Sequence, residues 1–221
     1  MLAKELISEM VTELKTSDTG QKALNWMEVF RISHLPIVNN MEFLGLISDT
    51  DIYDLNEPEQ AIGNHKLSLI KPFVRLDQHI FDVISIAARL KLSVVPVLDD
   101  HNHYKGVVLV SDLIDAMADM SSLKEPGGLI VLDILQNDYS LSQIAQIIES
   151  NDAKIMALYI STHPESTRME VSIKLNTNNL MPVIRTFERF QYEVSAWHGD
   201  EDDMDNFYSD RFDSFMRYLD V

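Results

Sequence analysis

The chain has 221 residues, which is enough for one or two domains with buried cores. Its 18 Lys and Arg against 35 Asp and Glu give a net charge of −17, which disfavours nucleic acids and anionic membranes as partners because their phosphates are repelled. The absence of cysteine excludes disulfide scaffolds, thiol nucleophiles and cysteine-based zinc sites. There is neither an apolar run of about 20 residues nor a signal-type N-terminal segment, so we expect a cytoplasmic protein.

The most informative feature of the chain is an internal repeat. The segment from His34 reads HLPIVNNMEFLGLISDTDIYDL, and the segment from Val94 reads VVPVLDDHNHYKGVVLVSDLIDAM. Three residues match in pairs: Pro36 with Pro96, Gly45 with Gly106, and Asp51 with Asp112. Apolar residues at helical spacing precede each proline. Each copy is therefore predicted to fold as helix, strand, turn, strand and helix, and the two copies are expected to pack together.

The first copy contains the motif GLISDTDI, which begins at Gly45 and follows an apolar residue and a proline. This pattern resembles the CBS domain, and residues 1–60 and 61–122 together resemble a tandem CBS pair. The second copy keeps the glycine and the aspartate but has Leu109 where the motif has its hydroxyl. The resemblance implies clefts that bind an adenine nucleotide or S-adenosylmethionine. It assigns Ser48 and Asp51 to one cleft, Asp112 to the other, and the adenine ends to Leu35, Ile37, Val95 and Val97.

The same motif also has a purely structural interpretation. A carboxylate can accept strong hydrogen bonds from two adjacent ribose hydroxyls, and a hydroxyl at a helix start can contact phosphate. However, Ser-x-x-Asp before an apolar helix is also typical of a capping box, which stabilises a helix by about 1 kcal/mol without a ligand. The alternative to a sensor is therefore a ligand-free dimeric scaffold with degenerate clefts. For a third alternative, an enzyme, the sequence offers no catalytic constellation.

Few cations are available to neutralise a phosphate-bearing ligand. The candidates near the repeats are Arg31, His34, Lys66, Arg75 and His79. Among AMP, ADP, ATP and S-adenosylmethionine, this scarcity favours ligands other than the triphosphate, and no cofactor is required. The pair His101 and His103 has spacing that suits a metal, but turns rich in Asp, Asn and His are commonly solvated and no third ligand is near. We predict no metal site.

A second domain is predicted over residues 128–198, with the domain boundary at Gly127 and Gly128. Its pattern gives the order βαββαβ, the ferredoxin-like split unit, with Ser140 as a helix cap. One strand alternates cleanly, with Met169, Val171, Ile173 and Leu175 on its buried face. Following a CBS pair, this domain resembles an ACT domain, and the chain resembles CBS–ACT proteins of the acetoin-utilisation type. The turn QNDYS from Gln136 lacks the glycine of the ACT ligand motif, so dimerisation is expected here rather than amino-acid binding.

The tail, residues 200–221, has acids at its start and an apolar stripe formed by Tyr208, Phe212, Phe215 and Leu219, which predicts an amphipathic helix. The predicted fold class is therefore α/β (α+β), with a tandem CBS pair, a ferredoxin-like ACT-type domain and a C-terminal helix. The predicted function is that of a non-enzymatic regulatory protein. It is expected to bind an adenosyl ligand, to form a homodimer and to act on an unidentified regulated protein.

Overall fold

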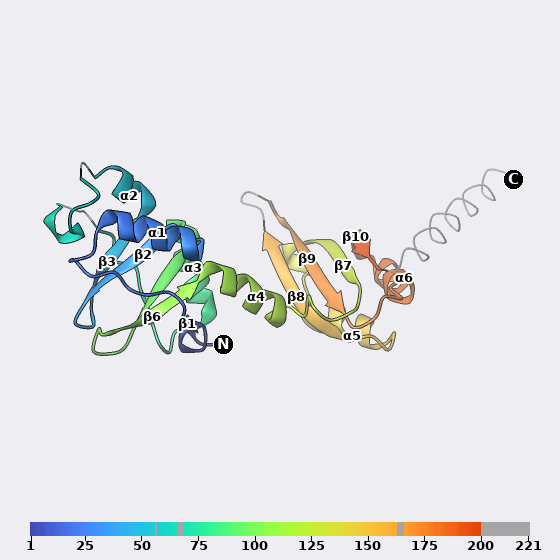
Figure 1. Ribbon diagram of the computed structural model, residues 1–221. Helices are drawn as coiled ribbons and strands as arrows, with labels where there is room; N and C mark the ends of the chain where they lie inside the picture. Colours follow the sequence, from blue (N-terminus) through green and yellow to red (C-terminus); the bar gives the residue numbers. More distant parts are fainter. Residues whose placement is uncertain (56, 66–68, 163–165, 200–221) are drawn as a thin grey trace, which may run out of the picture. The chain divides into compact units, whose positions relative to one another are not determined.

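The computed structural model of the protein describes residues 1–55, 57–65, 69–162 and 166–199. The chain divides into two compact units, Met1–Met117 and Ala118–Val221 (Figure 1). Each unit has its own hydrophobic core. The predicted tail helix and the cation candidate Lys66 lie outside the described residues. In the part of the chain that is described, no helix is long and apolar enough to cross a membrane.

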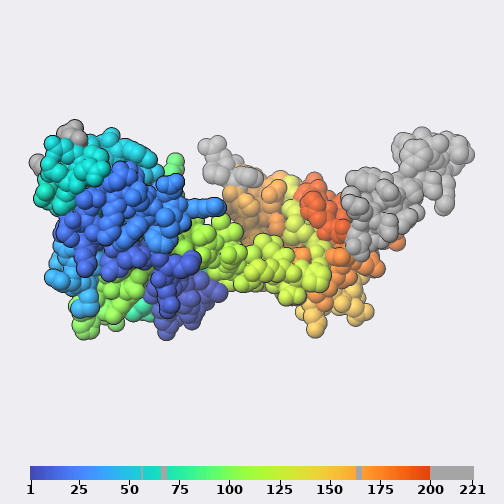
Figure 2. Space-filling view, in the orientation of Figure 1, coloured from blue at the N-terminus to red at the C-terminus, as the bar shows by residue number. Residues whose placement is uncertain are grey.

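Unit 1 contains two copies of the predicted helix, strand, strand and helix. The first copy consists of α1 (Gly20–Phe30), β2 (His34–Asn39), β3 (Glu42–Ser48) and α2 (Asp49–Tyr53). The second consists of α3 (Ile80–Leu90), β5 (Val94–Leu98), β6 (Tyr104–Leu109) and α4 (Val110–Met120). Short elements precede each copy: η1 (Ala3–Glu5), β1 (Ile7–Ser8), η2 (Ile62–Asn64) and β4 (Val74–Arg75). The structure confirms the predicted duplication. In the space-filling view of Figure 2, the first copy occupies much of the visible face of unit 1.

Equivalent residues shape the backbone of the two copies. Helices α1 and α3 both end in a left-handed residue, Arg31 with φ 54° and Lys91 with φ 53°. The carbonyl of Ser33 then accepts the amide of Asp49 at 3.1 Å, and the carbonyl of Ser93 accepts the amide of the residue that opens α4, also at 3.1 Å. Each hairpin is therefore tied to the helix that follows it in the same way.

Two glycines make room for segments that cross between the copies. Gly45 has φ +153°, and a Cβ added there would lie 2.6 Å from the Cβ of Leu69. Gly106 has φ +144°, and a Cβ there would lie 2.5 Å from Cγ2 of Ile7. Leu69 precedes the second copy in sequence but packs against the first, while Ile7 precedes the first copy but pairs with β6 of the second. Each copy is therefore completed by the chain that leads into the other.

The strands of unit 1 form a four-stranded sheet of order β1-β6-β5-β4 and a two-stranded sheet of β2 and β3. One continuous cluster of buried side chains draws on both copies, from Leu14 and Ile47 in the first to Val83 and Val108 in the second. Because both copies contribute to this one cluster, they pack against each other. This confirms the expectation that the two copies pack together.

Unit 2 has the predicted βαββαβ order. Its elements are β7 (Leu129–Leu135), η3 (Gln136–Asp138), α5 (Leu141–Glu149), β8 (Ile155–Thr162), β9 (Arg168–Leu175), α6 (Met181–Arg189) and β10 (Glu193–His198). The strands form an antiparallel sheet of order β10-β7-β9-β8. This order confirms the ferredoxin-like fold of the predicted second domain.

Short-range sequence patterns correctly predicted a helix cap and a buried strand face in unit 2. The hydroxyl of Ser140 accepts a hydrogen bond from the amide of Gln143 at 3.4 Å and so caps α5, as predicted. On β9 the predicted apolar face is buried throughout: Met169, Val171, Ile173 and Leu175. The two helices contribute Ile144, Ile148, Val183, Ile184 and Phe187 to the same core. The sheet is therefore covered on one face by α5 and α6.

Candidate functional site

The motif residues Ser48 and Asp51 lie where β3 ends and α2 begins. Ser48 is the N-cap of α2, and its hydroxyl accepts the amide of Asp51 at 3.1 Å. In return, Oδ2 of Asp51 accepts the amide of Ser48 at 2.8 Å and the Ser48 hydroxyl at 2.6 Å. This arrangement is a capping box, so the structural interpretation of the motif is realised.

The capping box leaves part of the Asp51 carboxylate unused. Both hydrogen bonds from Ser48 end on Oδ2, and the side chain of Asp51 is exposed. Among the described residues, Oδ1 has no hydrogen-bond partner. A carboxylate held in this way is oriented by the fold and still has acceptor capacity for a second molecule.

The second copy differs at the corresponding place. Leu109 occupies the position of Ser48, and its side chain is buried. Asp112 is half-buried, and its Oδ1 accepts a hydrogen bond from the hydroxyl of Ser111 at 3.3 Å. In the first copy, Ser48 orients the carboxylate of Asp51. In the second copy, the apolar Leu109 stands at the position of Ser48.

The four apolar residues assigned to the adenine ends belong to the core. Leu35, Ile37, Val95 and Val97 are each at most 1% exposed. Leu35 pairs with Ile47 across the hairpin of the first copy, and Val95 pairs with Val108 in the second. Their side chains pack against the core in this structure, and their contact with adenine stays a prediction.

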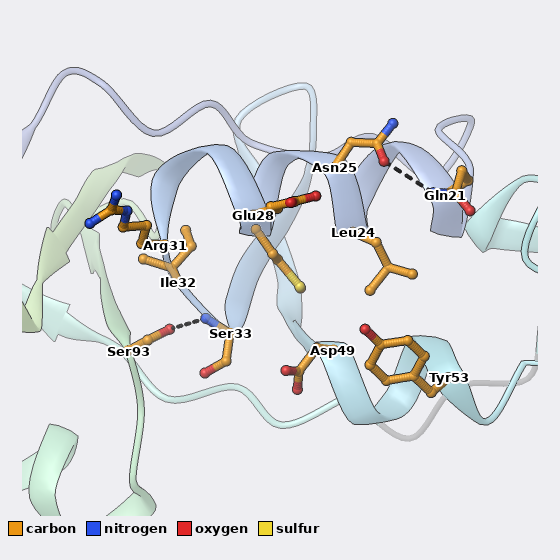
Figure 3. Close-up of a pocket in the computed structure, with 11 residues that line it drawn as sticks. Gln21, Leu24, Asn25, Glu28, Arg31, Ile32, Ser33, Asp49, Tyr53 and Ser93 are labelled. Atoms are coloured by element: carbon orange, nitrogen blue, oxygen red, sulfur yellow. Dashed lines mark hydrogen bonds between the residues drawn. The ribbon is translucent and has the colours of Figure 1, made fainter.

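A cavity of about 720 Å³ lies beside this motif, between α1 and α2. Figure 3 shows Asp49 and Tyr53 of α2 and Leu24 of α1 pointing into the space between the two helices. The cavity is lined by Gln21, Leu24, Asn25, Met27, Glu28, Arg31, Ile32, Ser33, Asp49, Tyr53 and Ser93. Neither Ser48 nor Asp51 lines it, so the predicted site and the cavity are neighbours along α2 rather than one site.

Of these lining residues, sequence reasoning singled out only Arg31 as a functional candidate. Gln21, Leu24, Glu28 and Arg31 recur every three to four residues, which places them on one face of α1. That spacing was a detectable signal for a polar helix face. The spacing of residues along α1 does not predict that α2 packs beside this face.

A half-buried polar cluster joins the two copies next to the cavity. Ser33 donates its amide to the hydroxyl of Ser93 at 3.0 Å, and Nδ1 of His34 lies 3.1 Å and 3.2 Å from the hydroxyls of Ser33 and Ser93. The amide of Ser93 also donates to Nδ1 at 3.4 Å, so this nitrogen acts as an acceptor. Burial lowers the pKa of His34, although the carboxylates of Asp49 and Asp51 oppose the shift. The neutral ring is therefore the form that this cluster holds.

Two other cation candidates already have structural roles. Arg75 donates through its guanidinium to the carbonyl of Asp99 and to the side chain of Asn102. His79 caps α3, where its Nδ1 accepts the amide of Phe81 at 3.3 Å. Of the cations proposed from sequence, Arg31 lines the cavity.

The turn with two histidines forms around Asp99. Its carboxylate accepts the amides of His101 and His103 at 2.9 and 2.8 Å and forms an ion pair with Lys105. Desolvation acts to raise the pKa of Asp99, but these hydrogen bonds outweigh it and hold the pKa well below its usual range. Among the described residues, no group of three or more His, Asp or Glu side chains is arranged to hold a metal ion.

Unit 2 has a smaller cavity, of about 410 Å³, at the end of β7. One wall is an ion-pair network in which Nε of Arg168 lies 2.8 Å from Asp133 and a terminal nitrogen lies 2.5 Å from Glu193. The turn without the ACT glycine borders it through Asp138 and forms a short 3-10 helix. Arg168 on β9 is thus linked to side chains of β7 and β10. The cavity lining holds more acidic than basic groups, with Asp133, Asp138 and Glu193 against this arginine.

The comparisons with known proteins agree with the duplication. The family model of the CBS domain matches residues 3–56 and 70–119, which are the two copies. Unit 1 is therefore a tandem pair of CBS domains.

Individual relatives are distant. An inosine-5'-monophosphate dehydrogenase of Methanocaldococcus jannaschii is 22% identical over 176 residues, which are 78% of this chain and 34% of that protein. The chain thus spans about a third of the length of that curated relative. A CBS domain pair/ACT domain protein from Thermotoga maritima is 22% identical with a TM-score of 0.48, covering 54% of this chain and 98% of that one. CBSX2 in complex with AMP is 16% identical with a TM-score of 0.45, covering 53% and 96%.

Proposed function

We propose that this protein is a cytoplasmic regulator without a catalytic reaction of its own, and that its first CBS domain senses an adenine nucleotide or adenosyl ligand. The observation that carries the proposal is the carboxylate of Asp51. It is exposed, it is fixed by Ser48 through Oδ2, and its Oδ1 is unengaged among the described residues. It lies in the motif by which the chain resembles nucleotide-binding members of the CBS family.

The chemistry of a ribose suits this arrangement. Two adjacent hydroxyls can donate to one carboxylate, and bonds to a charged acceptor are about twice as strong as bonds between neutral groups. Because Ser48 already fixes the carboxylate, a ligand would not have to bear the entropy of ordering that side chain. The capping role and the sensing role of Asp51 are therefore compatible.

The proposed ligand is AMP, ADP or S-adenosylmethionine rather than ATP. Arg75 and His79 are engaged in hydrogen bonds of the fold, and burial keeps His34 neutral. Asp49, Thr50 and Asp51 crowd the start of α2, so a triphosphate there would meet carboxylates with few cations to compensate. An uncharged or singly phosphorylated ligand meets less repulsion.

The proposal also assigns a role to unit 2. Its ferredoxin-like sheet would act as an ACT-like dimerisation domain, so that ligand binding in the CBS pair is transmitted through a homodimer to a regulated protein. The missing glycine of the turn at Gln136–Asp138 and the engaged Arg168 support this role over amino-acid binding.

A second candidate is a dimeric scaffold with empty clefts. It is favoured by two observations: the capping box explains Ser48 and Asp51 without a ligand, and Leu109 replaces the hydroxyl in the second copy. In that case unit 1 would serve to position other proteins, and no adenosyl compound would bind.

Isothermal titration calorimetry with AMP, ADP, ATP and S-adenosylmethionine separates the two candidates. We expect micromolar binding by the wild-type protein and a loss of about tenfold or more in Asp51→Asn, because an amide keeps one cap acceptor but loses the charge. The matched control is Asp54→Ala, which removes an exposed carboxylate from the end of the same helix and should leave affinity unchanged. No binding of any of the four compounds would leave the scaffold as the better explanation.

A further inference from the structure

The cavity between α1 and α2 carries polar groups that the second CBS domain lacks at the equivalent positions. Four of its lining residues differ in character from their counterparts, which lie 60 residues later on the first helix and 61 on the second. The pairs are Gln21 with Phe81, Glu28 with Ala88, Asp49 with Val110 and Tyr53 with Ile114. The second domain forms the same order of helices and strands without two carboxylates and an amide at these places. The shared backbone therefore does not require them.

Glu28 stands where an α-helix disfavours a carboxylate. It lies in the last turn of α1, near the negative end of the helix dipole, and that turn contains no basic residue. Its side chain is exposed, and among the described residues it forms no ion pair. A charge that the backbone does not require and the helix dipole opposes is typical of a functional position.

Helix α2 supplies a second carboxylate and an aromatic ring from the opposite side of the cavity. Oδ1 of Asp49 accepts the amide of Thr50 at 2.7 Å, which orients the carboxylate and leaves Oδ2 without a hydrogen bond among the described residues. In Figure 3 the ring of Tyr53 points into the space between the helices, while the guanidinium of Arg31 is directed away from Asp49 and Tyr53. An aromatic ring beside carboxylates attracts an ammonium group.

The rest of the lining distinguishes an organic cation from a metal ion. Leu24, Met27 and Ile32 contribute apolar surface to the same cavity as the two carboxylates. Mg²⁺ and Ca²⁺ prefer oxygen ligands or water on every side, whereas apolar side chains suit the methylene groups of an alkyl chain. The volume of about 720 Å³ lies within the range of roughly 300–1,000 Å³ that is usual for small-molecule sites.

From this we propose that the cavity between α1 and α2 binds a linear aliphatic polyamine, with one ammonium group at Glu28 and another at Asp49 and Tyr53. The methylene chain between the ammonium groups would lie on the apolar part of the lining. This site is separate from the proposed adenosyl site, because Asp51 does not line the cavity. It can therefore be tested without reference to nucleotide binding.

Isothermal titration calorimetry of the full chain with spermidine tests the proposal. The protein has a net charge of −17, so the titration is done at about 0.15 M NaCl to screen diffuse attraction to its surface. We expect one saturable site per chain. Glu28→Ala and Tyr53→Ile, which introduce the residues of the second domain, should each raise the dissociation constant about fivefold or more. The matched control Asp54→Ala removes an exposed carboxylate of α2 outside the lining and should change it less than about twofold.

Thermal melts of the same variants separate binding from a structural role. Glu28→Ala removes a carboxylate that the helix dipole disfavours and adds a good helix former, so its melting temperature should equal or exceed that of the wild-type protein. Weaker spermidine binding at undiminished stability would support the proposal. Three results would overturn it: no saturable binding, an equal loss in Asp54→Ala and Glu28→Ala, or a lower melting temperature in Glu28→Ala. The second would indicate attraction to the acidic surface as a whole, and the third would assign Glu28 to the fold.

Discussion

The two CBS domains share a backbone and differ in chemistry. Both have the left-handed residue after the first helix, the serine carbonyl that ties the hairpin to the second helix, and the glycine that admits a crossing segment. In contrast, the hydroxyl of Ser48 becomes Leu109, and the polar face of α1 becomes the apolar face of α3. The copies agree at the positions that set the backbone geometry. They differ at the last residue of the second strand, Ser48 or Leu109, and on the outer face of the first helix. The proposed sensing role belongs to the first domain, where Ser48 orients the carboxylate of Asp51.

The largest effect should come from the crossing segments. Gly45→Ala would place a Cβ against the Cβ of Leu69 and 2.9 Å from the carbonyl of Ile70, in a backbone conformation that disfavours side chains. Gly106→Ala would place a Cβ 2.5 Å from Cγ2 of Ile7 in a similarly disfavoured backbone conformation, but the next nearest atoms, including the closest backbone atom, lie at 3.9 Å. We expect Gly45→Ala to lower the free energy of unfolding by about 3 kcal/mol and Gly106→Ala by about 1–2 kcal/mol, as measured by urea denaturation. Equal losses in the two variants would contradict the interpretation of the crossing contacts.

The capping box should give the next effect. Asp51→Ala removes the acceptor for the amide of Ser48, and we expect it to lower the free energy of unfolding by about 1 kcal/mol. Asp112→Ala, the equivalent change in the second domain, should lower it by less than about 0.5 kcal/mol because only a 3.3 Å bond from Ser111 is lost. Denaturant midpoints of the two variants, measured side by side, test this difference. If Asp112→Ala lowered the free energy of unfolding more than Asp51→Ala, the capping box of the first domain would not be the more stabilising of the two helix starts.

The smallest effect concerns pH. The folded protein holds His34 with a lowered pKa, so the unfolded chain binds a proton more readily near the ordinary value of 6.5. The stability that depends on neutral His34 is therefore present above about pH 6.5 and is lost as the pH falls toward the folded pKa. Because the ring is only half-buried, we expect a loss of less than about 1 kcal/mol between pH 7.5 and 5.5.

A natural comparison is available for this histidine as well. His34 corresponds to Val94 in the second domain, so His34→Val places the residue of one copy in the other. The pH-dependent part of the stability should be smaller in this variant than in the wild-type protein when both are unfolded in urea at the two pH values. An unchanged pH dependence would show that other groups are responsible.

Sequence patterns predicted the fold wherever the determining interactions were local. The repeat was visible because Pro36, Gly45 and their counterparts recur in order, and the cap at Ser140 depends on an amide three residues away. The burial of Met169 to Leu175 followed from strict alternation along one strand. In each case the physical cause lies within a few residues of the signal.

Features that depend on distant residues were not predictable in this way. The cluster of His34 and Ser93 joins side chains 59 residues apart. The pairing of β1 with β6 likewise joins distant parts of the chain, Ile7 with Val108 and Ser8 with Val107. The cavity between α1 and α2 required knowledge of how the two helices approach. The sequence of the motif allows two interpretations of Ser48 and Asp51, a capping box and a ligand site. The structure shows the capping box, which is compatible with a ligand site.

A crystal structure of the protein with AMP would test the central claim most directly. The sensing proposal predicts a ribose at the junction of β3 and α2, with both hydroxyls within hydrogen-bonding distance of the Asp51 carboxylate and no ligand at Asp112. A nucleotide bound only beside Asp112, or in the cavity between α1 and α2, would contradict it, and so would unoccupied CBS domains at saturating AMP.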